Sequence, residues 1–149
     1  MTYNKNIIQS SVPELWTFLD FTYANGNNPI EEWYTSELSV ESRFMFDDLL
    51  KNNSKIKDHL HWIGFRGYLS GKASKEKIWE LGFKCDRRQY RLLGVFREGA
   101  RKQAVLLIGC YHKNQVYTPA NALNTAITRS KAFSEGKASY RERKNRTDR

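Results

Sequence analysis

Apolar and aromatic residues first form a short continuous run near the N-terminus. Further along the chain they recur at the spacing of an α-helix. The aromatic run at 15–23 predicts a strand, and the Asn-, Gly- and Pro-rich residues 24–29 predict the loop that follows it. Residues 29–53 predict a helix in two pieces that separate near 36–39, with Ser39 as the N-cap of the second piece. Its apolar pairs, spaced i, i+4 so that they form one stripe, are Val40 with Phe44, Met45 with Leu49, and Phe46 with Leu50.

The middle of the chain changes from weak periodicity to three strand-like runs. Residues 55–77 are rich in glycine and lysine and predict a short helix followed by a basic, mobile loop. Apolar runs at 78–85, 89–97 and 103–111 are separated by connections short enough for hairpins. These three runs therefore predict an antiparallel meander.

The C-terminal part predicts one more helix and a tail. Residues 118–133 are expected to form the helix, with Thr118 as its N-cap and Pro119 at the first helical position. The basic residues from about 134 to 149 have no apolar face and predict a flexible tail. This element order predicts one α+β domain over 1–149. Its mostly antiparallel sheet would combine the N-terminal strand with the meander, and would pack against N-terminal helices and a C-terminal helix gathered on one side.

Charge is divided unevenly between the two parts of the chain. The whole sequence has 25 Lys and Arg against 16 Asp and Glu, a net charge of +9. Residues 1–50 hold two of the basic residues and eight of the acidic ones, so residues 51–149 carry the remaining 23 basic and eight acidic residues, a net +15. A chain with its charge divided in this way is expected to present one strongly basic surface. Such a surface suits a polyanion and favours nucleic acid as a partner, although many of the charges could simply solvate one face.

Several classes of protein are disfavoured by composition. A hydrophobic content of 40% with 13% aromatic residues argues against disorder. No run approaches the ~18 apolar residues of a membrane span, and the first residues lack the basic and apolar regions of a secretory signal. Cys85 and Cys110 provide neither a disulfide framework nor a zinc site. A cytoplasmic protein with two reduced thiols, no membrane partner and no cofactor is expected.

Candidate chemistry gathers where the third meander strand ends. Metal-independent RNA cleavage needs a base near the ribose 2′-OH, cations around the phosphate and an acid for the departing oxygen. His112 can act as acid or base near neutral pH, and Tyr111 offers a flat ring with a polar tip. In a regular strand Tyr111 and Lys113 face one side and His112 the other, so these two assignments compete.

Basic residues of the meander supply candidate phosphate contacts. Arg91 is a lone arginine in an apolar run, where it could hold the scissile phosphate or, alternatively, form an ion pair with Glu80 across the hairpin. Lys84 near the same hairpin could bind phosphate as well. Further candidates for contacts to the RNA backbone are Arg66, Lys72, Lys75, Lys77, Arg87 and Arg88. For Arg87 and Arg88, a role as solvated turn residues is equally expected.

Four short motifs occur in a fixed order along this half of the chain. They read Trp79-Glu80-Leu81, Tyr90-Arg91, Tyr111-His112-Lys113-Asn114 and Thr118-Pro119. In this order they resemble the RelE/HigB family of bacterial toxins, in particular its branch of phage-derived proteins. The resemblance covers roughly residues 15–133 and is specific only over 78–128.

Two positions depart from the family pattern. Members commonly carry an arginine directly after the Glu-Leu pair, where this chain has Gly82, and tend to have a second lysine where it has Asn114. Lys84 lies two residues beyond Gly82, on the same strand face, and could supply the missing charge. The departures bear on the cleavage chemistry more than on the fold.

The resemblance implies a RelE-like fold and a function. Members are toxins of type II toxin–antitoxin systems that act as mRNA interferases: metal-independent endoribonucleases that inhibit growth by cutting mRNA, usually on the ribosome. A cognate antitoxin, expected here to be of the helix-turn-helix type, would neutralise the toxin. The related ParE-type members inhibit DNA gyrase instead, so a toxin that does not cut RNA, or a basic nucleic-acid-binding module, remains an alternative.

Overall fold

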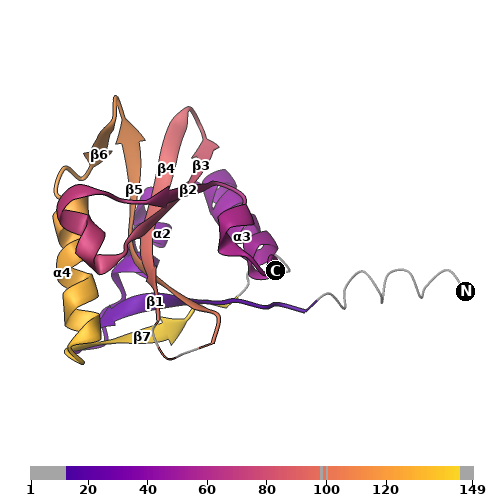
Figure 1. Cartoon of the computed structure of the whole chain (residues 1–149). Coiled ribbons are helices and arrows are strands. Elements are labelled where there is room, and N and C mark those ends of the chain that lie inside the picture. The colour runs from indigo at the N-terminus through magenta and orange to yellow at the C-terminus, as the bar shows by residue number, and fades with distance from the viewer. Residues whose placement is uncertain (1–12, 98, 100, 145–149) are drawn as a thin grey trace, which may run out of the picture.

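The computed structural model describes residues 13–97, 99 and 101–144. Its centre is a seven-stranded sheet in the order β2-β3-β4-β5-β1-β7, with β6 paired to the end of β5 (Figure 1). β1 runs parallel to β5, and the other strand pairs are antiparallel. The strands are β1 (Thr17–Tyr23), β2 (Phe65–Tyr68), β3 (Trp79–Cys85), β4 (Arg88–Phe96), β5 (Gln103–Lys113), β6 (Val116–Thr118) and β7 (Ala138–Glu142).

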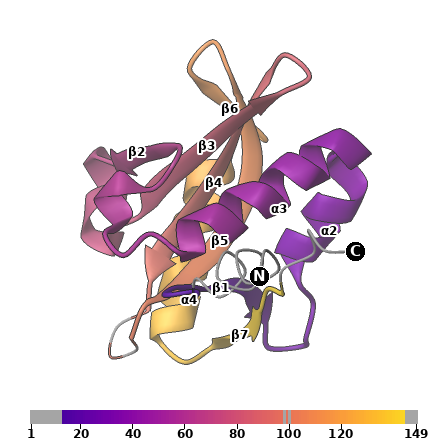
Figure 2. The same ribbon diagram turned by 90° about the vertical axis from the view of Figure 1, so that its right-hand side faces the viewer.

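Helices cover both faces of this sheet. One face is covered by α2 (Pro29–Glu37) and α3 (Val40–Ser54), and the other by α4 (Ala122–Ser134) (Figures 1 and 2). Two short 3₁₀ helices, η1 (His59–His61) and η2 (Gly71–Glu76), flank β2 in the sequence. None of the helices in the described part of the chain has both the length and the apolar character needed to cross a membrane.

The predicted α+β class with a mostly antiparallel sheet is confirmed, but the prediction that the helices lie on one side is wrong. The reason lies in the meander, whose central strands are apolar on both faces. Leu92 packs in the core on the α2–α3 side, and the next residue, Leu93, packs in the core on the α4 side. A strand buried on both faces needs a layer on each of them.

The first strand and the two helix pieces form where the sequence predicts them. Asn28 caps α2 by accepting a 2.9 Å hydrogen bond from Glu31 N, and Ser39 caps α3 by accepting one of 3.1 Å from Ser42 N. The predicted stripe on α3 is only half correct. Phe46, Leu49 and Leu50 are buried, whereas Val40, Phe44 and Met45 are exposed.

The stretch predicted as a basic, mobile loop is ordered secondary structure. It contains β2, which pairs with β3 through a register shift between Phe65 and Gly67, and then η2. Ala73 of η2 is fully buried, and Ser130 Oγ of α4 donates a 2.9 Å hydrogen bond to Glu76 Oε1. A four-residue strand with a shifted register leaves no alternating pattern that sequence inspection could detect.

The last predicted helix begins later than expected. β5 runs on to Lys113, and a two-residue turn at Asn114 and Gln115, both with positive φ (51° and 63°), leads into β6. Thr118 is therefore the last residue of a strand, followed by a cis bond to Pro119, and not an N-cap. The helix α4 starts at Ala122, after Asn121.

The predicted flexible tail also proves partly wrong. Residues 138–142 form β7, which pairs antiparallel with β1, and Arg143 N donates a 2.8 Å hydrogen bond to Phe18 O. The Arg143 side chain is 3% exposed and forms ion pairs of 2.7 Å with Asp20 and 3.0 Å with Glu31. Backbone pairing with β1 and the two ion pairs of Arg143 anchor this segment. Residues 1–12, which bear on the signal prediction, and the end of the tail at 145–149 lie outside the described residues.

Candidate functional site

The structure distinguishes between the two competing faces at the end of β5. Arg91 on β4 lies opposite Cys110 of β5, and both residues face α4. His112, two residues beyond Cys110, shares that face. Tyr111 packs against the core on the α2–α3 side, and Lys113 follows it on that face. Arg91 and His112 are therefore brought onto one surface, and Tyr111 and Lys113 are not part of it.

The centre of this surface is the carboxylate of Glu80. Tyr117 Oη of β6 donates a 2.5 Å hydrogen bond to Glu80 Oε2, and Arg91 Nε lies 3.7 Å from the same oxygen. Arg66 Nε of β2 lies 3.8 Å from Glu80 Oε1. The ion pair between Glu80 and Arg91 is the alternative that the sequence left open for Arg91.

The two arginines of this cluster differ in exposure. The side chain of Arg91 is 5% exposed, whereas that of Arg66 is 53% exposed. Arg91 Nη1 donates a 3.0 Å hydrogen bond to Tyr90 O, and among the described residues Arg91 Nε has no hydrogen-bond partner. Burial, reinforced by the nearby Arg66, lowers the pKa of the Arg91 guanidinium, while Glu80 opposes that shift. Arg66 is the guanidinium that a ligand can reach from solvent.

Gly82 makes room for the buried guanidinium. It pairs with Arg91 across the β3–β4 ladder, and a Cβ at this position would lie 2.6 Å from Arg91 Nη1 and 3.2 Å from Arg66 Cδ. The space that a side chain at position 82 would fill is thus taken by the Arg91 guanidinium from the neighbouring strand.

Tyr117 reaches across the face of the sheet to make its contact. β6 and β3 are separated by β5 and β4, about 14 Å at ~4.8 Å per strand spacing, and the Tyr117 and Glu80 side chains together bridge this distance. Burial and the hydrogen bond to Glu80 raise the pKa of Tyr117 above its ordinary value of 10.0, so the phenol keeps its proton at neutral pH. The His112 ring lies 5.2 Å from the Tyr117 ring, which extends the cluster toward the hairpin tips.

Of the predicted site residues near the β3–β4 turn, one lies on the Arg91 face. Lys84 is exposed on that face of β3, because it alternates with buried residues on the other side. Arg88 faces the α2–α3 side, where its guanidinium lies 4.4 Å from the centre of the Tyr111 ring. Arg87 occupies the turn itself with a φ of 64°. The three residues therefore do not form one phosphate clamp.

The predicted basic residues of η2 and its end lie elsewhere. Lys72 Nζ donates a hydrogen bond to Asn124 Oδ1 of α4. Lys75 and Lys77 line a cleft that also includes residues from the end of β4 and from β7. They are separate from the Glu80 cluster.

Two residues of the cluster were not assigned a role in the chemistry from the sequence. Glu80 was considered only as an ion-pair partner, although a carboxylate between two buried apolar residues of β3 is a visible signal. Tyr117 was not considered, because the β6 hairpin that directs it over Arg91 was not predicted.

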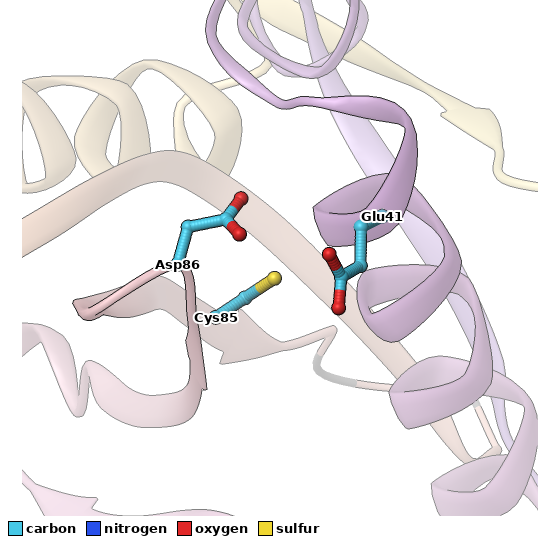
Figure 3. A group of neighbouring side chains, drawn as sticks. All are labelled: Glu41, Cys85 and Asp86. Atoms are coloured by element: carbon cyan, nitrogen blue, oxygen red, sulfur yellow. The ribbon is translucent and has the colours of Figure 1, made fainter.

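A second group of polar side chains lies on the opposite face. Glu41 of α3, Cys85 of β3 and Asp86 of the following turn have potential ligand atoms within 4.8 Å of one another (Figure 3). The sequence showed no clustered carboxylates, because 45 residues separate Glu41 from Asp86. Burial and the two carboxylates raise the pKa of the Cys85 thiol, which favours its protonated form, and Asp86 accepts a 3.0 Å hydrogen bond from Ser39 Oγ.

Comparison of the chain with protein-family models, with curated proteins and with solved structures finds no match.

Proposed function

We propose that the protein is a metal-independent endoribonuclease that cuts mRNA, the toxin of a type II toxin–antitoxin pair with a RelE-like fold. The observation that carries the proposal is the Glu80 carboxylate. It is held between Arg66, Arg91 and Tyr117 on the same face as His112, within residues 51–149, which carry a net charge of +15. A carboxylate, an imidazole and guanidinium groups provide the base, acid and cations that the reaction requires.

The proposed reaction is an in-line transfer at phosphorus. The ribose 2′-oxygen attacks the phosphate as Glu80 takes its proton, and the bond from phosphorus to the 5′-oxygen breaks as His112 donates a proton to that oxygen. The products are a 2′,3′-cyclic phosphate and a free 5′-hydroxyl. No oxidant, metal or further reactant is needed to balance the step.

The exposures of the two arginines support different roles in this reaction. Arg66 is the more exposed and is proposed to contact the phosphate directly, where its planar fork matches two phosphate oxygens. Arg91 is proposed to position Glu80 from beneath, because its guanidinium is buried against that carboxylate. Lys84, exposed on the same face, would add positive charge near the RNA backbone.

The proposal includes two partners. The first is mRNA, with the ribosome as the place of cleavage; the second is a cognate antitoxin of the helix-turn-helix type. The net charge of +15 over residues 51–149 supports an RNA partner, since phosphate contacts supply most sequence-independent affinity for nucleic acids.

The test is a cleavage assay with end-labelled mRNA, with and without ribosomes, mapped by primer extension in the presence of EDTA. Wild-type protein should generate defined cuts, whereas Glu80→Gln and His112→Ala should each lower the rate by about 100-fold. Lys131→Gln, an exposed change on α4, is the matched control and should cut normally. Intact mRNA under every condition would refute the proposal.

A toxin that binds gyrase without cutting RNA is the second candidate, and the burial of Arg91 is compatible with it because a buried guanidinium need not contact RNA. An arginine side chain that is 5% exposed and paired with Glu80 can serve structure alone. In this case the purified protein should block DNA supercoiling and leave ribosome-bound mRNA whole.

A further inference from the structure

A cleft of about 770 Å³ lies beside the end of β4 and the start of β7. It is bounded by η2, the end of β4, the C-terminal part of α4 and the start of β7, and its lining includes Lys75, Lys77, Arg97 and Tyr140. Glu80 pairs with Leu93 of β4, and Arg97, directly after β4, follows Leu93 by four residues, which corresponds to a separation of roughly 13 Å. The lining of the cleft includes neither Glu80 nor Arg66, Arg91 or Tyr117, so the cleft is a separate site beside the same strand.

One wall of the cleft holds a cation in a fixed position. Arg97 Nη1 donates a 2.8 Å hydrogen bond to Gln103 Oε1, and the guanidinium lies 4.6 Å from the centre of the Tyr140 ring. Tyr140 itself packs edge-on against Phe133 of α4 at 6.0 Å and remains 39% exposed. A planar guanidinium stacked on an exposed ring offers both charge and a flat surface to a ligand.

Two more cations of the lining, Lys75 and Lys77, lie on η2 and at its end. η2 is joined to α4 by the hydrogen bond from Ser130 Oγ to Glu76 Oε1, so Glu76, the carboxylate in the lining, is already engaged. Lys75 and Lys77 flank Glu76 in the sequence, and with Arg97 they give the lining an excess of positive charge. Tyr68, at the rim, is 49% exposed and supplies a second ring.

We infer that this cleft binds a single-stranded segment of RNA. Lys75, Lys77 and Arg97 would contact backbone phosphates, and a base would stack against Tyr140 and its guanidinium. Exposed aromatic rings interleaved with cations are the usual means of holding single strands without reading their sequence. The inference rests on the proposed function in one respect, namely that the RNA strand held here continues to the Glu80 cluster, roughly 13 Å away along β4.

The test measures binding separately from cleavage. A fluorescent 12-nucleotide RNA with 2′-O-methyl riboses cannot be cut, and its affinity is read by anisotropy at several salt concentrations. Lys75→Gln/Lys77→Gln and Arg97→Gln should each weaken binding at least tenfold. The slope of log K against log salt should fall by about 0.7 for each phosphate that the variant no longer binds. Lys55→Gln/Lys131→Gln removes two charges outside the cleft and should bind as wild type does.

Each result leads to a decision. Absence of binding by the wild type, or equal affinity of the cleft variants and the control, overturns the inference, whether or not the protein cuts mRNA. If the cleft variants bind RNA normally but lose binding of an acidic peptide partner, the cleft binds a protein, and the inference is overturned. Weakened RNA binding by the cleft variants, in a wild-type protein that fails to cut mRNA, supports the inference while the proposed function fails.

Discussion

Gly82 and Arg91 face each other across the β3–β4 ladder, and the missing side chain of Gly82 is the space in which the Arg91 guanidinium lies. The Glu80 cluster depends on this fit, because a methyl group at position 82 would come within 2.6 Å of Arg91 Nη1. The buried arginine and the glycine beside it thus form one structural unit.

Gly82→Ala should displace Arg91 and destabilise the protein by roughly 1–3 kcal/mol, the usual cost of overfilling a packed site. Urea unfolding followed by tryptophan fluorescence measures this change. Lys84→Ala, an exposed change on the same face of β3, is the control and should alter stability little. Equal stabilities for the two variants would show that Arg91 can move aside at no cost.

Substitution of the two arginines near Glu80 should separate contact with RNA from support of the fold. Arg66→Gln should lower the cleavage rate by about 100-fold with little loss of stability, because its side chain is 53% exposed. Arg91→Gln should destabilise the protein by roughly 2 kcal/mol, since the Glu80 carboxylate loses a buried partner. Cleavage assays and thermal unfolding on the same samples give both quantities. A fully active Arg66→Gln protein would remove Arg66 from the site.

Arg143 should be required for the fold although it follows the last strand. Arg143→Ala leaves Asp20, itself 3% exposed in its side chain, without its ionic partner, and should cost about 3–5 kcal/mol. Arg141→Ala, an exposed change on β7, is the matched control. Denaturant midpoints for both variants measure the difference, and identical midpoints would mean that β7 contributes no stability.

The thiol of Cys110 should make stability depend on pH in the alkaline range. Burial raises its pKa from the ordinary 9.0 to about 12, so above pH 9 the unfolded chain releases a proton that the folded protein retains. The unfolding free energy should therefore be unaffected by Cys110 below pH 9. It should fall by about 1.4 kcal/mol per pH unit as the pH rises from 9 toward 12.

Urea unfolding in reducing buffer between pH 8 and pH 10.5 tests this dependence. Cys110→Ala lacks the titrating group, so its stability should decline less steeply than that of the wild type. The comparison of slopes is unaffected by the packing cost of the substitution. Parallel pH profiles would show that the thiol of the folded protein ionises at its ordinary pKa.

The sequence predicted the elements whose signal is local. The strands of the meander follow from alternation, and the cap at Ser39 follows from a side-chain hydrogen bond within three residues. The two-sided covering of the sheet was missed, although the consecutive residues Leu92 and Leu93, buried on opposite faces, already require it. β7 was missed because its partners are distant in the sequence: it pairs with β1, and Arg143 after it binds Asp20 and Glu31, more than 100 residues away.

The candidate site was predicted in the same partial way. Arg91 and His112 were singled out because a lone charge in an apolar strand and a histidine at a strand end are visible in the sequence. The choice between faces needed the register of β4 against β5, which pairs Arg91 with Cys110. Tyr117 needed the turn at Asn114 and Gln115, whose left-handed residues no pattern of polarity reveals.

The position of β1 in the sheet has a consequence for how the chain folds during synthesis. β1 lies between β5 and β7, so both of its neighbours are synthesised at least 80 residues after it. Until residues 138–142 leave the ribosome, β1 has an unpaired edge, and Arg143 is not yet present to balance the charge of Asp20. Contacts this distant in sequence slow folding, and the sheet of the nascent protein stays incomplete until residues 138–143 are available to β1.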